Sequence, residues 1–276
     1  MNLYKSLIFI LYLGIFLGSG FRTPAQSRDS ITLYGTLDTV QVIRQRIQHA
    51  NEANAGARVT HISPAILQAN KTRSLAELLT DHTSIYIKSL GTGALSTASF
   101  RGTSASQTRV NWNGINITPP LSGTFDFSQI PVFFTDNINL YYGSSHVKNG
   151  TGAIGGSVNL FTDTDWNRGV NGRVLAEYGS YNTYTVGGQA NISGNKSASK
   201  TRLYYQHSDN DYTYLNKVLT NIPFREKRQD AAYSQFGIMQ EGYFRVSPYT
   251  RLTAVAWYQK NHRNLPQPLG VVNRSQ

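Results

Sequence analysis

The sequence predicts an α+β domain followed by the first strands of an antiparallel transmembrane β-barrel, and three observations support this fold class. Residues 1–25 have the pattern of a secretory leader, and the composition is typical of a β-rich exported protein. The hydrophobic pattern also changes near residue 165. Short elements and Gly-rich loops precede that point, and long strands with one apolar face follow it.

Residues 1–25 are typical of a signal peptide. Lys5 precedes an apolar run over residues 7–17, and small residues around Ala25 form a cleavage site. That run is shorter than the ~20 residues of a spanning helix, although an N-terminal membrane anchor is the alternative. Because no later run approaches that length, any insertion into a membrane would use a β-barrel.

The composition excludes several classes of site. Charged residues make up 15% of the chain, against about 25% in ordinary soluble domains. There is no cysteine, which rules out disulfides, thiolate metal sites and cysteine nucleophiles. The formal net charge is +11, but the cations are scattered rather than gathered in a stripe, so no nucleic-acid partner is expected.

Residues 60–163 have the pattern of a compact α+β domain, preceded by a polar segment over residues 26–59. Ser74 and Glu77 form a capping-box pattern before a helix that ends near Asp81. Strands are expected at 85–87, 137–142 and 157–162, with loops at 90–99 and 116–128. Asn113-Gly114 predicts a type I′ hairpin within residues 109–117.

Residues 166–276 alternate between apolar and small or polar side chains. The apolar phase runs through residues 184–192 and 252–258, with parts of further strands at 174–178, 203–205 and 236–246. This pattern is typical of about five barrel strands with one lipid-facing side, although a soluble antiparallel sheet also alternates. Short turns near 180, 194–199 and 247–249 contrast with the long segment 209–230, which is expected outside the cell.

The chain has few motifs that could support catalysis. Residues 150–155 match the dinucleotide fingerprint G-x-G-x-x-G, but a strand pattern follows where a helix is required, so a Gly-rich bend is the better interpretation. The six histidines have no metal-ligand spacing, and the carboxylates form no acid/base pair. We therefore expect no enzyme, no cofactor and no metal.

Several stretches together resemble the plug domain of TonB-dependent outer-membrane receptors. Residues 74–79 (SLAELL), 100–106 (FRGTSAS), 126–131 (DFSQIP) and 152–159 (GAIGGSVN) are similar to successive plug segments. In motif style the resemblance is closest to cobalamin receptors. Tyr142 and Asn139 stand where the family commonly has arginine and an acid, which weakens the subtype assignment but not the plug assignment.

The resemblance implies two functional sites. A TonB box, the strand that binds TonB, is assigned to Asp38, Thr39, Val40, Gln41 and Val42. Substrate contacts from the plug's apical loops are assigned to Leu95, Thr97, Ser104, Leu121 and Ser122. The alternative for the five predicted substrate contacts is that they are ordinary small loop residues without a specific role in binding.

The function implied is TonB-dependent import of a large scarce solute, cobalamin-like or an iron chelate, across the outer membrane. The partners are TonB with its energising complex, the substrate and outer-membrane lipid, and a surface lipoprotein partner is left open. The alternative is an exported β-rich binding or adhesion module without transport. A complete barrel of this kind has about 22 strands, so we expect this chain to be a truncated receptor that cannot transport by itself.

Overall fold

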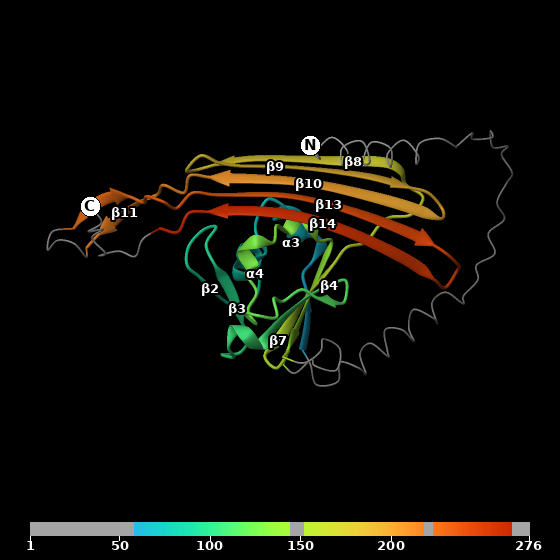
Figure 1. The fold of residues 1–276 in the computed structure, drawn as a ribbon, viewed down its shortest axis with the longest axis horizontal. Helices are drawn as coiled ribbons and strands as arrows, with labels where there is room; N and C mark the ends of the chain where they lie inside the picture. Colours follow the sequence, from blue (N-terminus) through green and yellow to red (C-terminus); the bar gives the residue numbers. More distant parts are fainter. Residues whose placement is uncertain (1–57, 144–151, 218–222, 267–276) are drawn as a thin grey trace, which may run out of the picture. The chain divides into compact units, whose positions relative to one another are not determined.

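The computed structural model describes residues 58–143, 152–217 and 223–266. All of them belong to one compact unit, Asn51–Gln276. Within it a smaller α+β domain precedes a broad antiparallel sheet (Figure 1). The predicted leader and residues 38–42 lie outside the described residues. No helix within the described ranges has the length and hydropathy needed to span a bilayer.

The α+β domain is organised around a five-stranded sheet of order β1-β6-β7-β4-β5. Strands β4 and β7 are parallel, and the other neighbours are antiparallel. A separate ribbon pairs β2 with β3. The strands are β1 (Arg58–His61), β2 (Tyr86–Ser89), β3 (Ser96–Ser99), β4 (Thr108–Trp112), β5 (Ile115–Asn116), β6 (Asn137–Tyr142) and β7 (Gly156–Phe161).

Several predictions for this domain are confirmed, and one is wrong. Asn113 and Gly114 have φ values of 48° and 85°, as a type I′ turn requires. The predicted strand 137–142 coincides with β6. Residues 90–99, however, are not all loop, because Ser96–Ser99 form β3. The residues of β3, Ser-Thr-Ala-Ser, are small and include a single β-branched side chain, so they gave little strand signal; the strand forms by pairing with β2.

Two α-helices and three 3₁₀ turns complete the domain: α3 (Pro64–Ala69), α4 (Leu75–His82), η1 (Ala105–Gln107), η2 (Phe127–Gln129) and η3 (Val132–Phe134). The predicted capping box of α4 is present, with the Ser74 hydroxyl accepting from the Glu77 amide and the Glu77 carboxylate accepting from the Ser74 amide. Leu75, Leu78 and Leu79 are fully buried. The helix is therefore fixed by its cap and by one apolar face.

Substituting Ser74 tests the cap directly. Ser74→Ala removes the acceptor for the Glu77 amide, and we expect a loss of about 1 kcal/mol of stability. Ser74→Asp keeps an acceptor oxygen and serves as the matched control. Thermal unfolding of the two variants measures the difference, and equal melting temperatures would contradict a stabilising role for the cap.

The broad sheet, called the wall sheet here, has the strand order β14-β13-β10-β9-β8. All its neighbours are antiparallel. The strands are β8 (Gly169–Gly179), β9 (Thr183–Ser193), β10 (Ser197–Ser208), β13 (Tyr233–Arg245) and β14 (Arg251–Arg263). They account for the five strands that the alternation predicts.

The two faces of the wall sheet differ as the alternation predicts. In β10 the even positions from Ala198 to Ser208 are buried, while Leu203 and Tyr205 are exposed. In β13 the odd positions from Tyr233 to Tyr243 are buried, while Phe236 and Ile238 are exposed. The buried face packs on the α+β domain, since Tyr204 and Met239 belong to the same apolar core as the leucines of α4. An exposed apolar face is what a lipid-facing barrel wall requires.

The strand connections define two ends of the wall sheet. Residues 194–196 and 246–250 make the short-turn end. Residues 180–182 and the connection from 209 to 232 make the opposite, long-loop end. The long connection contains a ribbon of β11 (Thr213–Asn216) and β12 (Phe224–Lys227). The hydrophobic pattern of the sequence does not predict these two strands.

Candidate functional site

Three loops of the α+β domain converge near the long-loop end of the wall sheet. Asp126 joins two of them: its carboxylate accepts from the Ser96 amide at 3.0 Å and from the Ser128 hydroxyl at 2.6 Å. Arg263, the last residue of β14, forms an ion pair with the same carboxylate at 2.8 Å. The Asn210 side chain, just beyond β10, donates to the Thr92 carbonyl at 3.2 Å. The loops are thus held against the wall at this end.

The structure places the predicted substrate contacts on these three loops. Leu95 and Thr97 belong to the β2–β3 ribbon, Ser104 precedes η1, and Leu121 and Ser122 lie between β5 and η2. Leu121 is fully exposed, and Leu95 is 39% exposed. The Ser104 and Ser106 hydroxyls are 2.8 Å apart, and a Cβ added at Gly123 would lie 3.7 Å from Ser106. The loops carrying Ser104 and Ser122 are therefore neighbours, and no side-chain contact between Leu95 and Leu121 is observed in the described residues.

A buried group of charges, which we call the Asp136 cluster, connects the α+β domain to the wall sheet nearer the short-turn end. It consists of Asp136, Lys200, Arg202 and Glu241. Asp136 lies just before β6 and binds Lys200 at 2.9 Å and Arg202 at 2.5 Å. Arg202 also faces Glu241 on β13 at 3.3 Å, and both of these side chains are fully buried. Burial alone would raise the pKa of Asp136, but the charges of Arg202 and Lys200 hold it below its ordinary value.

Lys71 extends this polar region into the α+β domain. Its ammonium group donates to the carbonyls of Val132 at 3.4 Å and Thr135 at 2.5 Å. Burial lowers the pKa of Lys71 to about 8, although the negative charge of Asp136 partly opposes that shift. The cation therefore fastens the segment before β6 to the start of α4.

Other wall side chains bind main-chain carbonyls of the α+β domain. Arg202 donates to Phe133 at 3.0 Å, Tyr204 donates to Thr72 at 3.0 Å and Gln235 donates to Ser128 at 2.9 Å. Gln259 donates to the carbonyl of Gln129. Sequence reasoning missed these contacts because carbonyl acceptors leave no trace in side-chain identity. The one sequence signal for contacts between the wall and the α+β domain was the pair of cations Lys200 and Arg202, which occupy buried positions of β10.

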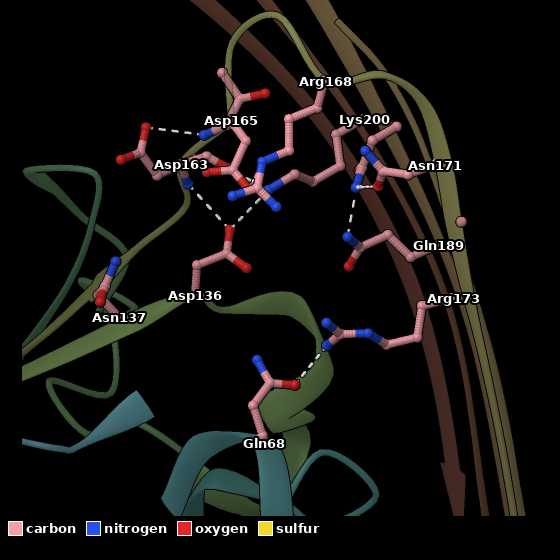
Figure 2. Close-up of a pocket in the computed structure, with 13 residues that line it drawn as sticks. Gln68, Asp136, Asn137, Asp163, Asp165, Arg168, Asn171, Arg173, Gln189 and Lys200 are labelled. Carbon is pink, nitrogen blue, oxygen red and sulfur yellow. Dashed lines mark hydrogen bonds and ion pairs between the residues drawn. The ribbon is translucent and has the colours of Figure 1, made fainter. Parts of the chain in front are cut away.

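A polar cavity of about 350 Å³ lies beside the Asp136 cluster, between α3, the linker over residues 163–168 and strands β8 to β10. Figure 2 shows the Lys200 amino group directed at Asp136, and Arg173 reaching from β8 to Gln68 on α3. None of the predicted substrate contacts lines it. In the described part of the chain no group of three or more His, Asp or Glu side chains could hold a metal ion.

Gly155, the last residue of the fingerprint-like stretch, and the adjacent Gly156 have a steric role. A Cβ added at Gly155 would lie 2.1 Å from Thr103, and one added at Gly156 would lie 2.5 Å from the Tyr141 carbonyl. The stretch leads into strand β7 rather than a helix. Close packing therefore explains these glycines better than nucleotide binding does.

Comparison with known proteins agrees with this architecture. Residues 51–157 match the family described as TonB-dependent Receptor Plug Domain. The chain carries a TonB-dependent receptor plug domain. The plug, as we now call the α+β domain, is followed by antiparallel strands of the kind found in such receptors, so the predicted fold class is confirmed.

Curated relatives include vitamin B12 transporters. The chain is 32% identical over 135 residues to the vitamin B12 transporter BtuB of Photobacterium profundum, covering 49% of this chain and 22% of that protein. It is 32% identical over 126 residues to the protein of the same name from Vibrio cholerae, covering 45% and 20%. The chain thus spans about a fifth of the length of these relatives.

Solved structures with this fold include a siderophore receptor, a pyoverdine receptor and a copper transporter. The siderophore receptor PiuA from Acinetobacter baumannii has a TM-score of 0.55 at 21% identity, covering 74% of this chain and 26% of that one. The pyoverdine outer membrane receptor FpvA from Pseudomonas aeruginosa has a TM-score of 0.58 at 15% identity, covering 74% and 27%. At these identities the likeness shows the fold alone.

Proposed function

We propose that the whole receptor of which this chain forms a part imports a large scarce solute, cobalamin-like or an iron chelate, across the bacterial outer membrane. The observation that carries the proposal is a plug bound to the inner face of a wall whose other face is exposed and apolar. Relatives named as transporters of vitamin B12 and receptors for siderophores support it. Outer-membrane lipid would cover the apolar face.

The orientation follows from the connections between strands. Outer-membrane barrels place short turns in the periplasm and long loops outside. The long-loop end would then face the medium, where the plug loops carrying Leu95, Thr97, Ser104, Leu121 and Ser122 could meet a solute. A solute bound there would be blocked by the plug until the plug is rearranged.

Energy for that rearrangement would come through TonB. Residues 38–42 would pair as an extended strand with a sheet edge of TonB, because an extended segment can add a strand to an exposed edge. Pulling on this segment would act first on β1, which is a four-residue strand at the edge of the plug sheet. No covalent chemistry is needed, and no nucleic acid takes part.

Deleting residues 38–42 in the whole receptor tests the proposal. Cells expressing the variant should lose uptake of radiolabelled cyanocobalamin or ferric siderophore while keeping surface binding. Deleting residues 46–50, which removes the same length of chain but leaves the box, is the matched control and should retain uptake. Uptake by the box-deleted receptor would contradict the assignment. Binding without uptake in the unmodified receptor would favour a surface binding module instead.

A further inference from the structure

We propose that Asp126 is a positioning residue of the solute site, and that through it the affinity for solute depends on the packing of the plug against the wall. The proposal rests on the proposed function and adds a means of regulation to the same site. It concerns the apical ribbon, defined as residues 86–99, and the loop over residues 116–128. These two segments carry four of the five predicted solute contacts: Leu95, Thr97, Leu121 and Ser122.

The Asp126 carboxylate receives donors from three separate segments of the chain. Its Oδ1 atom accepts from the Ser96 amide at 3.0 Å, and from the amide and the hydroxyl of Ser128 at 3.1 and 2.6 Å. Its Oδ2 atom accepts from the Gln129 side chain at 3.2 Å and from the Arg263 guanidinium at 2.8 Å. The side chain is 12% exposed. A carboxylate with so many donors is held in one orientation and holds those donors in place.

Ser96 passes this constraint to the apical ribbon. Its hydroxyl donates to the Ser89 hydroxyl at 3.0 Å, so the two strands of the ribbon are joined at this residue. Ser96 is buried, whereas Thr97 is half-buried and Leu95 is exposed. Because side chains alternate along a strand, fixing Ser96 determines where its two neighbours point. The bond from Ser96 to Asp126 therefore sets the ribbon's predicted contacts relative to those of the neighbouring loop.

The wall holds Asp126 from the other side. Arg263, the last residue of β14, pairs with its carboxylate. Gln235 of β13 and Gln259 of β14 donate to main-chain carbonyls of η2, the turn that directly follows Asp126. The wall thus fixes both the carboxylate and the backbone that carries it.

The tip of the apical ribbon also lies against the wall. Asn210 donates to the Thr92 carbonyl at 3.2 Å, and a Cβ added at Gly93 would overlap the Tyr233 ring of β13. Gly93 has a φ of 69°, a left-handed conformation that favours glycine. The ribbon is therefore held at its tip by direct contact and at β3 through Asp126. Both attachments would be lost when the plug moves away from the wall.

Affinity for solute then depends on where the plug lies. A solute that meets a fixed ribbon causes little further loss of conformational entropy, whereas a loose ribbon must be ordered on binding, at a cost in affinity. Displacing the plug separates Asp126 from Arg263 and frees the ribbon. The solute is thus bound tightly while the plug packs on the wall and is released once the plug has been displaced.

Hydrogen–deuterium exchange of residues 90–99 and equilibrium binding test the proposal in the whole purified receptor, with radiolabelled cyanocobalamin and a ferric siderophore as probes. The decisive variant is Arg263→Gln, because in the described part of the chain Arg263 has no hydrogen bond or ion pair with the ribbon and acts on it through Asp126. We expect faster exchange in the ribbon, and about tenfold weaker binding of the probe that the unmodified receptor binds. Arg251→Gln is the matched control: Arg251 is the first residue of β14 and pairs with Asp163 at 3.5 Å, so exchange and binding should stay unchanged.

A double variant separates positioning from independent effects on binding. Asp126→Asn should also weaken binding about tenfold, and combining it with Arg263→Gln should weaken binding little further, because both changes break the same link. Losses that multiply to about a hundredfold would overturn the proposal. Unchanged ribbon exchange in the Arg263→Gln receptor would overturn it as well.

The two readouts also distinguish this proposal from the proposed function. A receptor that binds neither probe would contradict the proposed function, and ribbon exchange in Arg263→Gln would still decide the positioning role. Unmodified affinity and unchanged exchange in Arg263→Gln would contradict the positioning role and leave the proposed import standing.

Discussion

Replacing Asp136 by asparagine is expected to weaken the attachment of the plug to the wall sheet by about 3 kcal/mol, because it leaves the buried Lys200 ammonium without a carboxylate and Arg202 with Glu241 alone. Arg202 is fully buried and the Lys200 side chain is 6% exposed, and both bind the same Asp136 oxygen. Asparagine keeps the volume but not the charge. Thermal unfolding of the whole receptor, together with limited proteolysis of the plug, measures the loss.

Two further variants test whether a loss of stability in Asp136→Asn comes from the buried ion pairs. Asp165→Asn removes a carboxylate paired with Arg168 at 3.5 Å, but both of those side chains are about 70% exposed, so we expect little change. Adding Lys200→Met to Asp136→Asn should recover part of the stability by removing one unpaired cation. An Asp136→Asn receptor as stable as the Asp165→Asn receptor would show that the cluster does not hold the plug.

Gly156→Ala is expected to have the second large effect, a loss of about 2 kcal/mol or more from overpacking. The added methyl group would lie 2.5 Å from the Tyr141 carbonyl and 2.7 Å from the Phe100 ring. The backbone of β6 cannot move away without breaking its pairing with β7. The strand that closes the plug should therefore be displaced.

The matched control for Gly156 is Gly188→Ala in β9, where an added Cβ meets nothing within 4 Å. Chemical denaturation of both variants measures the difference. Equal midpoints for the two glycine variants would mean that β6 and β7 can separate without cost, and would contradict a steric role for Gly156.

Much of the fold could be predicted because its determinants are local. The Ser74–Glu77 capping box, the Asn113-Gly114 turn and the alternation in β9 and β14 each lie within one short stretch of sequence. Period-two alternation also assigned Val186 and Leu252 to the exposed apolar face, since they lie opposite Tyr205 and Phe244, which are exposed.

The Asp136 cluster could not be predicted in the same way. Asp136 meets Lys200 and Arg202 across more than 60 residues of chain, and an inward charge in a strand looks the same as any polar residue facing a lumen. The β11–β12 ribbon was missed because its charged residues are typical of a loop, and only cross-strand pairing defines it. The roles of residues 38–42 and of the five predicted substrate contacts stay predictions.

Several wall side chains donate hydrogen bonds to main-chain carbonyls of the plug, and this affects which sequence changes the two parts tolerate. Tyr204 binds the carbonyl of Thr72 and Gln259 binds that of Gln129, and every residue type offers the same acceptor at these positions. Substitutions at Thr72 or Gln129 that keep the backbone path would preserve the contact. At these contacts plug and wall can therefore diverge in sequence independently, and a plug could be exchanged between barrels that share the donors and keep the cations that pair with Asp126 and Asp136.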